Sequence, residues 1–357
     1  MIELWVKNMD IEVVDLFCGA GGLTYGLRKS GLNVKAGFDI DQICEYPYEV
    51  NNHAKFICKD IRNVTPQEIK DLYSNDSIKV LAGCAPCQPF SQMTKKYKNN
   101  QSKDEKYNLL LEFGRLVEGI LPDIISMENV PEIRKTSIFK KFLNILETNG
   151  YKTDYKVVYC PDYGIPQNRR RFVLLAAKEK ISLLPKTHSK ENYRTVRDTI
   201  SNLPPVRVGE ICPTDILHQT AKLSDINLQR IKLSRPGGTW NDWPEDLRCN
   251  CHKKESGKTY SSVYGRMEWD KIGPTITTQF YCYGTGRYGH PEQDRALTLR
   301  EGALIQTFPV DYQFVEPNKP FSLKEVAREI GNAVPVRLGE IIGESIKKYL
   351  GEKKYDR

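Results

Sequence analysis

Hydrophobic residues in the first half of the chain form short runs, separated by longer segments with helical spacing. Such alternation predicts β-strands joined by helices. Because strands separated by helix-length connections pair in parallel, the order predicts an α/β fold with a doubly wound, mostly parallel sheet. We expect strands at residues 11–17, 34–39, 55–58, 78–83, 124–128 and 171–177, and helices at residues 21–30, 106–120 and 138–149.

The pattern changes after Pro185. Up to about Gly289 the periodicity is poor, glycine and tyrosine are frequent, and three of the four tryptophans occur here. Helical spacing returns at residues 298–307 and 335–350. We therefore expect a larger domain formed by residues 1–185 and 320–357, and a smaller loop- and strand-rich domain formed by residues 186–319.

Composition narrows the class of protein. The chain has 357 residues, a net charge of +8, 39% hydrophobic and 27% charged residues, as in soluble globular proteins. The modest basic excess permits an anionic partner such as nucleic acid without requiring one. We find no apolar signal-peptide core and no run of about 18 apolar residues. We therefore expect a cytoplasmic protein without membrane contact, whose ten cysteines are reduced.

A glycine-containing turn follows the first expected strand and begins the first helix, an arrangement that lets a ligand approach the backbone. The spacing disfavours a dinucleotide fold, because the third glycine of G-x-G-x-x-G would fall at Thr24. Asp39 and Asp60, at the next two strand ends, could accept hydrogen bonds from ribose and adenine. These features favour an adenosine pocket for S-adenosylmethionine, formed by Phe17, Gly19, Ala20, Gly21, Gly22, Asp39, Ile40, Asp60 and Ile61.

Cys87 follows the buried strand at residues 78–83, where a rigid scaffold could present a thiolate to a cleft. An alternative is redox chemistry, because Cys84-Ala85-Pro86-Cys87 is also a C-x-x-C motif with proline before the second cysteine. Glu128 and Arg171 favour the interpretation of Cys87 as a nucleophile over redox chemistry. In that interpretation Glu128, at the end of a neighbouring strand, is an acid. In that interpretation Cys84 only contributes to packing.

Six short segments, taken together and in order, indicate a protein family more specifically than any one of them does. They are residues 15–22, Pro86-Cys87-Gln88, Glu128-Asn129-Val130, Gln167–Arg171, Arg295–Pro309 and Gly331–Pro335. In this order the chain resembles DNA (cytosine-5) methyltransferases of the stand-alone bacterial restriction–modification type, over almost its full length.

The resemblance implies that the enzyme methylates carbon 5 of a cytosine flipped out of duplex DNA, using S-adenosylmethionine. Cys87 would be the nucleophile, Glu128 the acid near ring nitrogen 3, and Arg169 and Arg171 would hold the base. Pro86, Asn332 and Val334 would complete the cofactor site, and the C-terminal helix would pack beside the first strand. Residues 92–103 would form a lid.

The smaller domain would recognise the target sequence. Basic residues interleaved with aromatic ones could contact DNA there, and arginines can bind guanine edges in the major groove. The basic candidates are Arg230, Lys232, Arg235, Arg248, Lys253, Lys254, Lys258, Arg266 and Arg287. We expect a monomeric, nucleoid-associated enzyme whose cognate restriction endonuclease is a partner only by genetic pairing.

Three alternatives stay open at this point. An RNA (tRNA) cytosine-5 methyltransferase shares the scaffold, although its Cys-Phe-Thr motif is absent here. A non-catalytic DNA-binding relative would usually lose the Pro-Cys or Glu-Asn-Val residues, and the redox hypothesis is the third. No metal is expected: residues 249–252 offer three soft ligands, but a second pair at zinc-finger spacing is missing, and His218 or Cys212 could join only through the fold.

Overall fold

The computed structural model describes residues 10–86, 108–254, 257 and 261–353. The chain divides into two compact units, and each is described by itself. Unit 1 comprises Met1–Tyr159, Arg170–Thr187 and Val334–Arg357, and unit 2 comprises Cys160–Arg169 and His188–Ala333. Cys87 and the expected lid at residues 92–103 lie outside the described residues.

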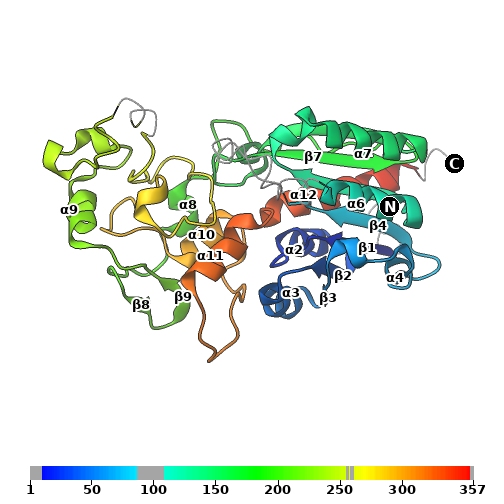
Figure 1. Cartoon of the computed structure of the whole chain (residues 1–357), viewed down its shortest axis with the longest axis horizontal. Helices are drawn as coiled ribbons and strands as arrows, with labels where there is room; N and C mark the ends of the chain where they lie inside the picture. Colours follow the sequence, from blue (N-terminus) through cyan, green and yellow to red (C-terminus); the bar gives the residue numbers. More distant parts are fainter. Residues whose placement is uncertain (1–9, 87–107, 255–256, 258–260, 354–357) are drawn as a thin grey trace. The chain divides into compact units, whose positions relative to one another are not determined.

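A seven-stranded sheet forms the centre of unit 1 (Figure 1). Its order is β3-β2-β1-β4-β5-β7-β6; β1 to β5 pair in parallel, and β7 is antiparallel to both of its neighbours. The sheet is therefore mostly parallel, as the sequence predicts. The strands are β1 (Ile11–Leu16), β2 (Asn33–Asp39), β3 (Lys55–Cys58), β4 (Ile78–Gly83), β5 (Ile124–Asn129), β6 (Lys152–Tyr159) and β7 (Arg170–Ala177).

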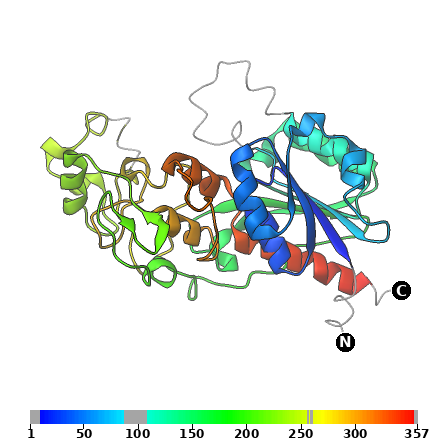
Figure 2. The same cartoon turned by 90° about the horizontal axis from the view of Figure 1, so that it is seen from below.

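Helices cover both faces of this sheet (Figure 2). On one face, apolar residues of β1, β4 and β5 pack with Phe113 of α6 and Phe142 of α7 in one buried cluster. On the other, α12 packs closely against α2: a Cβ at Gly26 would lie 2.3 Å from the Val336 carbonyl oxygen. The helices are α2 (Gly22–Lys29), α3 (Glu45–Asn52), α4 (Pro66–Lys70), α6 (Leu109–Ile120), α7 (Ser137–Thr148) and α12 (Val336–Lys353).

One strand of unit 1 was not predicted from the sequence. It is β6, which pairs only with β7 at the sheet edge and whose side chains are mostly exposed or half-buried. The C-terminal helix, predicted beside the first strand, packs on α2, the helix that follows this strand. Gly26 permits this contact because it has no side chain.

Unit 2 has much less regular backbone pairing. Within its described residues the only named strands are the short pair β8 (Ile211–Cys212) and β9 (Asp215–Gln219). An aromatic cluster that includes Trp240, Trp243 and Tyr283 forms part of its core. The helices are α8 (Val196–Ile200), α9 (Asp225–Leu233), α10 (Leu299–Ile305) and α11 (Leu323–Asn332), with short 3-10 helices between them.

The division into units differs from the predicted domain boundaries at two longer segments and at residues 186–187, which belong to unit 1. Residues 160–169 and 320–333 belong to unit 2, although both were predicted in the larger domain. The Gln167 side chain explains the first difference, because its amide nitrogen donates to Ile305 and Gln306 in unit 2. The second follows from α10, since Gln306 donates to the Ile330 carbonyl of α11. The functional roles of the two domains stay a prediction.

Candidate active site

The turn between β1 and α2 has an unusual backbone. Phe17, Gly19 and Gly21 have φ values of 60°, 51° and 87°. A positive φ is costly for a bulky residue such as phenylalanine, and such strain gathers at ligand sites. A Cβ at Gly19 would meet no atom within 4 Å, so the turn faces open space. The carboxyl end of β1 therefore offers accessible backbone, as the sequence predicts.

Asp39 at the end of β2 is joined to this turn. The Gly19 amide donates to Asp39 Oδ2 at 2.9 Å, and the Asp41 amide donates to Oδ1 at 3.0 Å. Burial raises the pKa of Asp39, while these backbone donors lower it in part. Ile40 follows with a relative exposure of 67%, which is high for an aliphatic side chain. A carboxylate and an apolar side chain thus lie beside the glycine turn.

The end of β3 has a different arrangement. Asp60 caps the 3-10 helix Ile61–Asn63 and forms an ion pair with Arg62 at 2.6 Å. This hydrogen bond from Arg62 is the main reason that the pKa of Asp60 is lowered. The Ile61 side chain is buried. Asp60 therefore already has a strong partner, which any ligand amino group would have to share.

The structure brings Cys84, Glu128 and Arg171 together at the ends of three strands. Glu128 lies on β5 with 2% of its side chain exposed, and Arg171 Nε on β7 is 2.8 Å from its Oε1. The Cys84 thiol, just beyond β4, donates to Glu128 Oε2 at 2.8 Å. Sequence analysis treated Cys84 as a packing residue; instead it contacts the carboxylate of the expected acid. The position of Cys84 in the C-x-x-C motif was the feature of the sequence that could have indicated a role beyond packing.

Asn129 positions the turn that leads to Cys87. Its side-chain amide donates to the Ala85 carbonyl at 3.1 Å, and its oxygen accepts from the Val130 amide at 2.8 Å. The side chain is buried, and Pro86 next to the bonded carbonyl is half-buried. Sequence analysis included Asn129 in a motif but gave it no role. The contact links the start of the Pro86-Cys87 segment to the strand that carries Glu128.

Comparison with known proteins identifies this arrangement. The model of C-5 cytosine-specific DNA methylases matches residues 11–348. The chain belongs to this family. It is 56% identical, over 95% of both chains, to the type II methylase M.HgiDII of Herpetosiphon aurantiacus. It is 32% identical to the type II methyltransferase M1.BsuMI of Bacillus subtilis, over 93% of this chain and 79% of the relative.

Solved structures of other methyltransferases have the same fold as this methylase. A putative DNA modification methyltransferase from an Escherichia coli prophage aligns with a TM-score of 0.71 and 24% identity, covering 95% of this chain and 99% of that one. The Dnmt2 methyltransferase of Schizosaccharomyces pombe aligns with a TM-score of 0.61 and 16% identity, covering 96% and 99%. At these identities the likeness shows the fold alone.

In this methylase the Arg169 side chain has different surroundings from that of Arg171. Arg169 is 2% exposed in unit 2, and its guanidinium donates to the carbonyls of Ile276 and Ala333. Asn332 is exposed at the end of α11 in unit 2, whereas Val334 is buried in unit 1. The catalytic role of Arg169 and the cofactor roles of Asn332 and Val334 stay predictions.

Two of the basic candidates for DNA contact are internal. Arg266 is 4% exposed and donates to four backbone carbonyls and to Asp294. Arg230 is 8% exposed and donates to the Leu247 carbonyl and to Asn227. These two arginines therefore bond the carbonyls of the loops that surround them, because buried carbonyls need donors. Arg235, with 75% of its side chain exposed, stays available.

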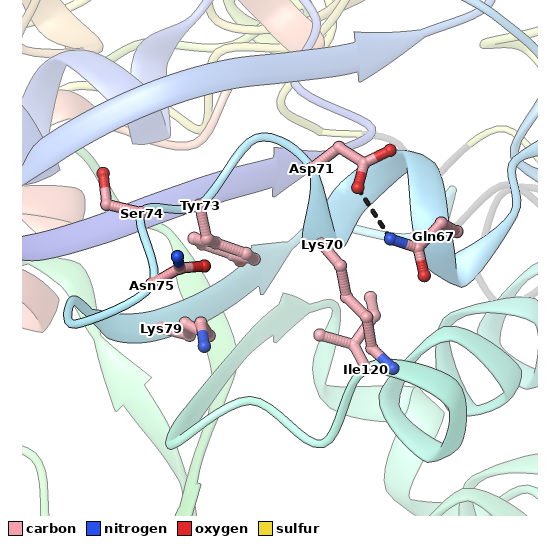
Figure 3. Close-up of a pocket in the computed structure, with 8 residues that line it drawn as sticks. All are labelled: Gln67, Lys70, Asp71, Tyr73, Ser74, Asn75, Lys79 and Ile120. Atoms are coloured by element: carbon pink, nitrogen blue, oxygen red, sulfur yellow. Dashed lines mark hydrogen bonds between the residues drawn. The ribbon is translucent and has the colours of Figure 1, made fainter.

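A polar pocket of this methylase lies at the other end of the sheet (Figure 3). Its lining includes Lys79 at the beginning of β4 and Ile120 at the end of α6, the helix that precedes β5. Ligands of open α/β sheets bind at the carboxyl ends of the strands. The pocket is therefore separate from the groups described above. Within the described residues, no helix is both long and apolar enough to span a membrane.

Proposed function

We propose that this methylase transfers the methyl group of S-adenosylmethionine to carbon 5 of a flipped-out cytosine in a specific duplex DNA sequence. We further propose that it is the modification enzyme of a restriction–modification system. The observation that carries the chemistry is the Glu128 carboxyl group, held between Arg171 and Cys84 beside the segment that leads to Cys87. Similarity to M.HgiDII, which is called a type II methylase, supports the biological role.

The described residues at the β1 and β2 ends fit S-adenosylmethionine. The open side of Gly19 would accept a ligand against the backbone, and Asp39 would accept hydrogen bonds from ribose hydroxyls. The exposed Ile40 would cover a face of the adenine ring. We assign Phe17, Ala20, Gly21, Gly22, Asp60, Ile61, Pro86, Asn332 and Val334 to the same site. When bound, the cofactor supplies an electrophilic methyl group on a sulfonium.

The target base must leave the duplex, because a side chain cannot reach its ring carbons inside the stack. The Cys87 thiolate would then add to carbon 6, which makes carbon 5 enamine-like and able to attack the methyl group. Loss of the carbon 5 proton, with expulsion of the thiolate, restores the aromatic ring. Methyl transfer thus consumes no oxidant or reductant, and the thiol is regenerated.

Glu128 would stabilise the addition step through ring nitrogen 3 and the exocyclic amine. Negative charge develops on the ring as the thiolate adds, and a hydrogen bond at nitrogen 3 disperses it. The ion pair to Arg171 and the thiol of Cys84 fix the carboxyl group from two sides. Arg171 would also favour the Cys87 thiolate and hold the base oxygen. Arg169 is assigned to the same group, although its contacts lie in unit 2.

Covalent trapping tests the chemistry. Duplex DNA with 5-fluorocytosine at the target should form a stable adduct with the full chain and S-adenosylmethionine, because fluorine cannot leave as a cation. Bisulfite sequencing of DNA from expressing cells would first identify the target. Cys87→Ser should abolish the adduct and turnover, whereas the matched variant Cys58→Ser, at an exposed cysteine of unit 1, should keep both. An adduct that persists in Cys87→Ser would contradict this role for Cys87.

Two further measurements test the substrate and the biological role. Methyl incorporation into duplex DNA should greatly exceed incorporation into tRNA, and the reverse ratio would favour the RNA alternative. Genomic DNA from expressing cells should resist one type II endonuclease that cleaves at the methylated sequence. Full cleavage at verified methylated sites by every such endonuclease would count against a protective role.

A further inference from the structure

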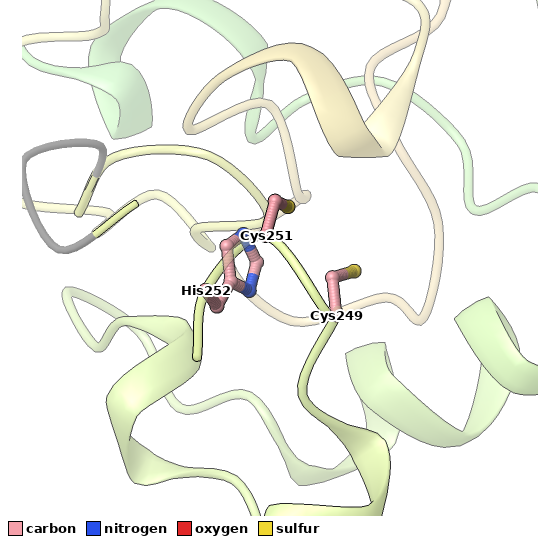
Figure 4. A group of neighbouring side chains, drawn as sticks. All are labelled: Cys249, Cys251 and His252. Atoms are coloured by element: carbon pink, nitrogen blue, oxygen red, sulfur yellow. The ribbon is translucent and has the colours of Figure 1, made fainter. Parts of the chain in front are cut away.

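Three potential metal ligands gather in unit 2 (Figure 4). Cys249, Cys251 and His252 each offer one ligand atom, and these three atoms lie within 4.8 Å of one another. Cys249 is half-buried, Cys251 is exposed and His252 is buried. Thiolate sulfur and imidazole nitrogen are the ligand types of zinc sites, which are usually tetrahedral. The cluster is thus compact, chemically suited to a soft divalent ion, and reachable from solvent.

The imidazole of His252 is a second, independent observation that points to a ligand at this cluster. Only 5% of the residue is exposed, and its Nδ1 has no hydrogen-bond partner among the described residues. Buried polar atoms without a partner are rare, and an ion or water is a common explanation. The ring stacks on Trp240 at 4.2 Å between centroids and 15° between planes. This stacking fixes the imidazole plane, as the packing around a metal-binding histidine often does.

Two side chains of unit 2, Tyr264 and Arg230, lie near the cluster. The Arg230 guanidinium lies over the Tyr264 ring at 5.4 Å, and the Cys249 sulfur is 3.8 Å from the Tyr264 hydroxyl.

The residues that sequence analysis considered as additional ligands are engaged elsewhere. The two ring nitrogens of His218 are hydrogen-bonded to Thr298 and to the Pro204 carbonyl. The Cys212 thiol contacts the Thr214 hydroxyl. Among the described residues the cluster therefore has three ligands, which fill three of the four positions of a tetrahedral site.

We propose that Cys249, Cys251 and His252 form a three-ligand site for Zn²⁺ or a similar soft divalent cation. Binding replaces the two thiol protons by two metal–sulfur bonds and releases those protons to solvent. The ion would fix residues 249–252 onto the ring of Trp240 and so order this part of unit 2. The site does not depend on the proposed chemistry of Cys87 or on the cofactor.

Cobalt titration of the full chain tests the site. Protein stripped with a chelator and kept reduced without oxygen should take up one Co²⁺ and develop the intense near-ultraviolet band of thiolate-to-cobalt charge transfer. Zn²⁺ should bleach this band by competition. Cys251→Ser should weaken binding by more than about tenfold, because even outer-shell changes cost about 10–100-fold. Cys251 is exposed, so this variant should fold normally.

Cys58→Ser provides the matched control, since Cys58 is an exposed cysteine of unit 1. It should bind cobalt as the unmodified chain does, and a second variant, Cys249→Ser, should lose the band. Absence of the band in the folded, reduced chain would overturn the proposal. Equal binding by Cys251→Ser would do so too, as would a Cys249–Cys251 disulfide that persists under the reducing conditions of the titration.

Discussion

The two units place buried charges in different ways. In unit 1 the buried carboxylates Glu12, Asp15 and Glu128 lie on strands of one sheet, whose backbone groups are already paired with one another. In unit 2 the named strand pairing within the described residues is limited to β8 and β9. There, buried arginines bond backbone carbonyls of loops, as Arg266 does for Ile231, Ser234, His290 and Gln293.

This difference explains why the units suit different tasks. A sheet satisfies its own backbone, so a polar side chain at a strand end is free to act on a ligand. A loop-rich unit must satisfy its carbonyls with side chains, which removes those side chains from the surface. Positive charge in unit 2 is therefore a poor guide to DNA contacts unless exposure is known.

The largest expected effect is on turnover, and it should distinguish Glu128 from Glu12, two buried carboxylates of unit 1. Glu128→Gln should lower methyl-transfer turnover by about 10²–10⁴-fold, since general acid catalysis contributes about this factor. Cofactor affinity should stay unchanged, because Glu128 lies on β5 rather than at the β1–β2 ends. Single-turnover methyl incorporation and calorimetric titration of the cofactor measure the two quantities.

Glu12→Gln is the matched control at the opposite end of the sheet. Glu12 is fully buried on β1 and bonded to Lys35 and Ser74. Its replacement should reduce stability but leave the turnover of the folded enzyme. Equal losses of turnover in both variants would contradict a special role for Glu128.

The next effect concerns the internal arginines of unit 2. Arg266→Met should lower the free energy of unfolding by about 3–5 kcal/mol, because it removes a buried guanidinium and leaves four backbone carbonyls without their donor. Arg235→Met should cost less than about 1 kcal/mol, since this side chain is exposed. The described tryptophans all lie in unit 2, so urea unfolding followed by tryptophan fluorescence reports on it. Similar losses in the two variants would refute the internal role of Arg266.

A smaller effect tests the packing of α10 in unit 2. Glycine in a helix normally costs about 1 kcal/mol relative to alanine, so Gly302→Ala would be expected to stabilise. Here the added Cβ would lie 2.1 Å from the Phe280 ring, and we expect a loss of about 1–3 kcal/mol instead. Thermal unfolding measures this loss of stability. Adding Phe280→Leu to the Gly302→Ala variant should restore part of it. In Gly114→Ala of unit 1, the contact is the flexible end of Ile145, so the loss should be smaller.

The smallest expected effect, counted per pH unit, is the change in the stability of unit 1 with pH. Burial raises the pKa of Asp15 to about 7, despite the hydrogen bond from Thr24, and the charge of Asp39 adds to the rise. The folded state therefore holds this proton where the unfolded state releases it. Stability should be greatest below about pH 4 for this group and fall until about pH 7, by at most about 1.4 kcal/mol per pH unit.

Asp15→Asn should remove this contribution, leaving that of Asp39. Glu12 gives the opposite trend: burial would raise its pKa, but bonds from Ser74 and Lys35 lower it to about 2. Its contribution is present above about pH 4.5 and is lost as the pH falls towards 2. Urea unfolding between pH 2 and 8 checks both trends. An unchanged slope in Asp15→Asn would show that Asp15 is not the group responsible.

Local sequence determined the frame of unit 1 and the polar residues at its strand ends. The runs at residues 11–17, 78–83 and 124–128 lie in three neighbouring central strands, because a strand buried on both faces is apolar along most of its length. Asp39 and Glu128 could be found because side chains at the ends of parallel strands share one edge of the sheet. The exposed edge strand β6 gave no such pattern.

Only the tertiary structure decided which neighbour each polar group has. Cys84 contacts Glu128, 44 residues away, and Arg266 bonds carbonyls that lie 24 to 35 residues away. Such contacts leave no period in the sequence, because they depend on how separate loops and strands meet in space. A burial pattern is local and can be predicted from the chain, whereas the partner of a hydrogen bond is set by the fold as a whole.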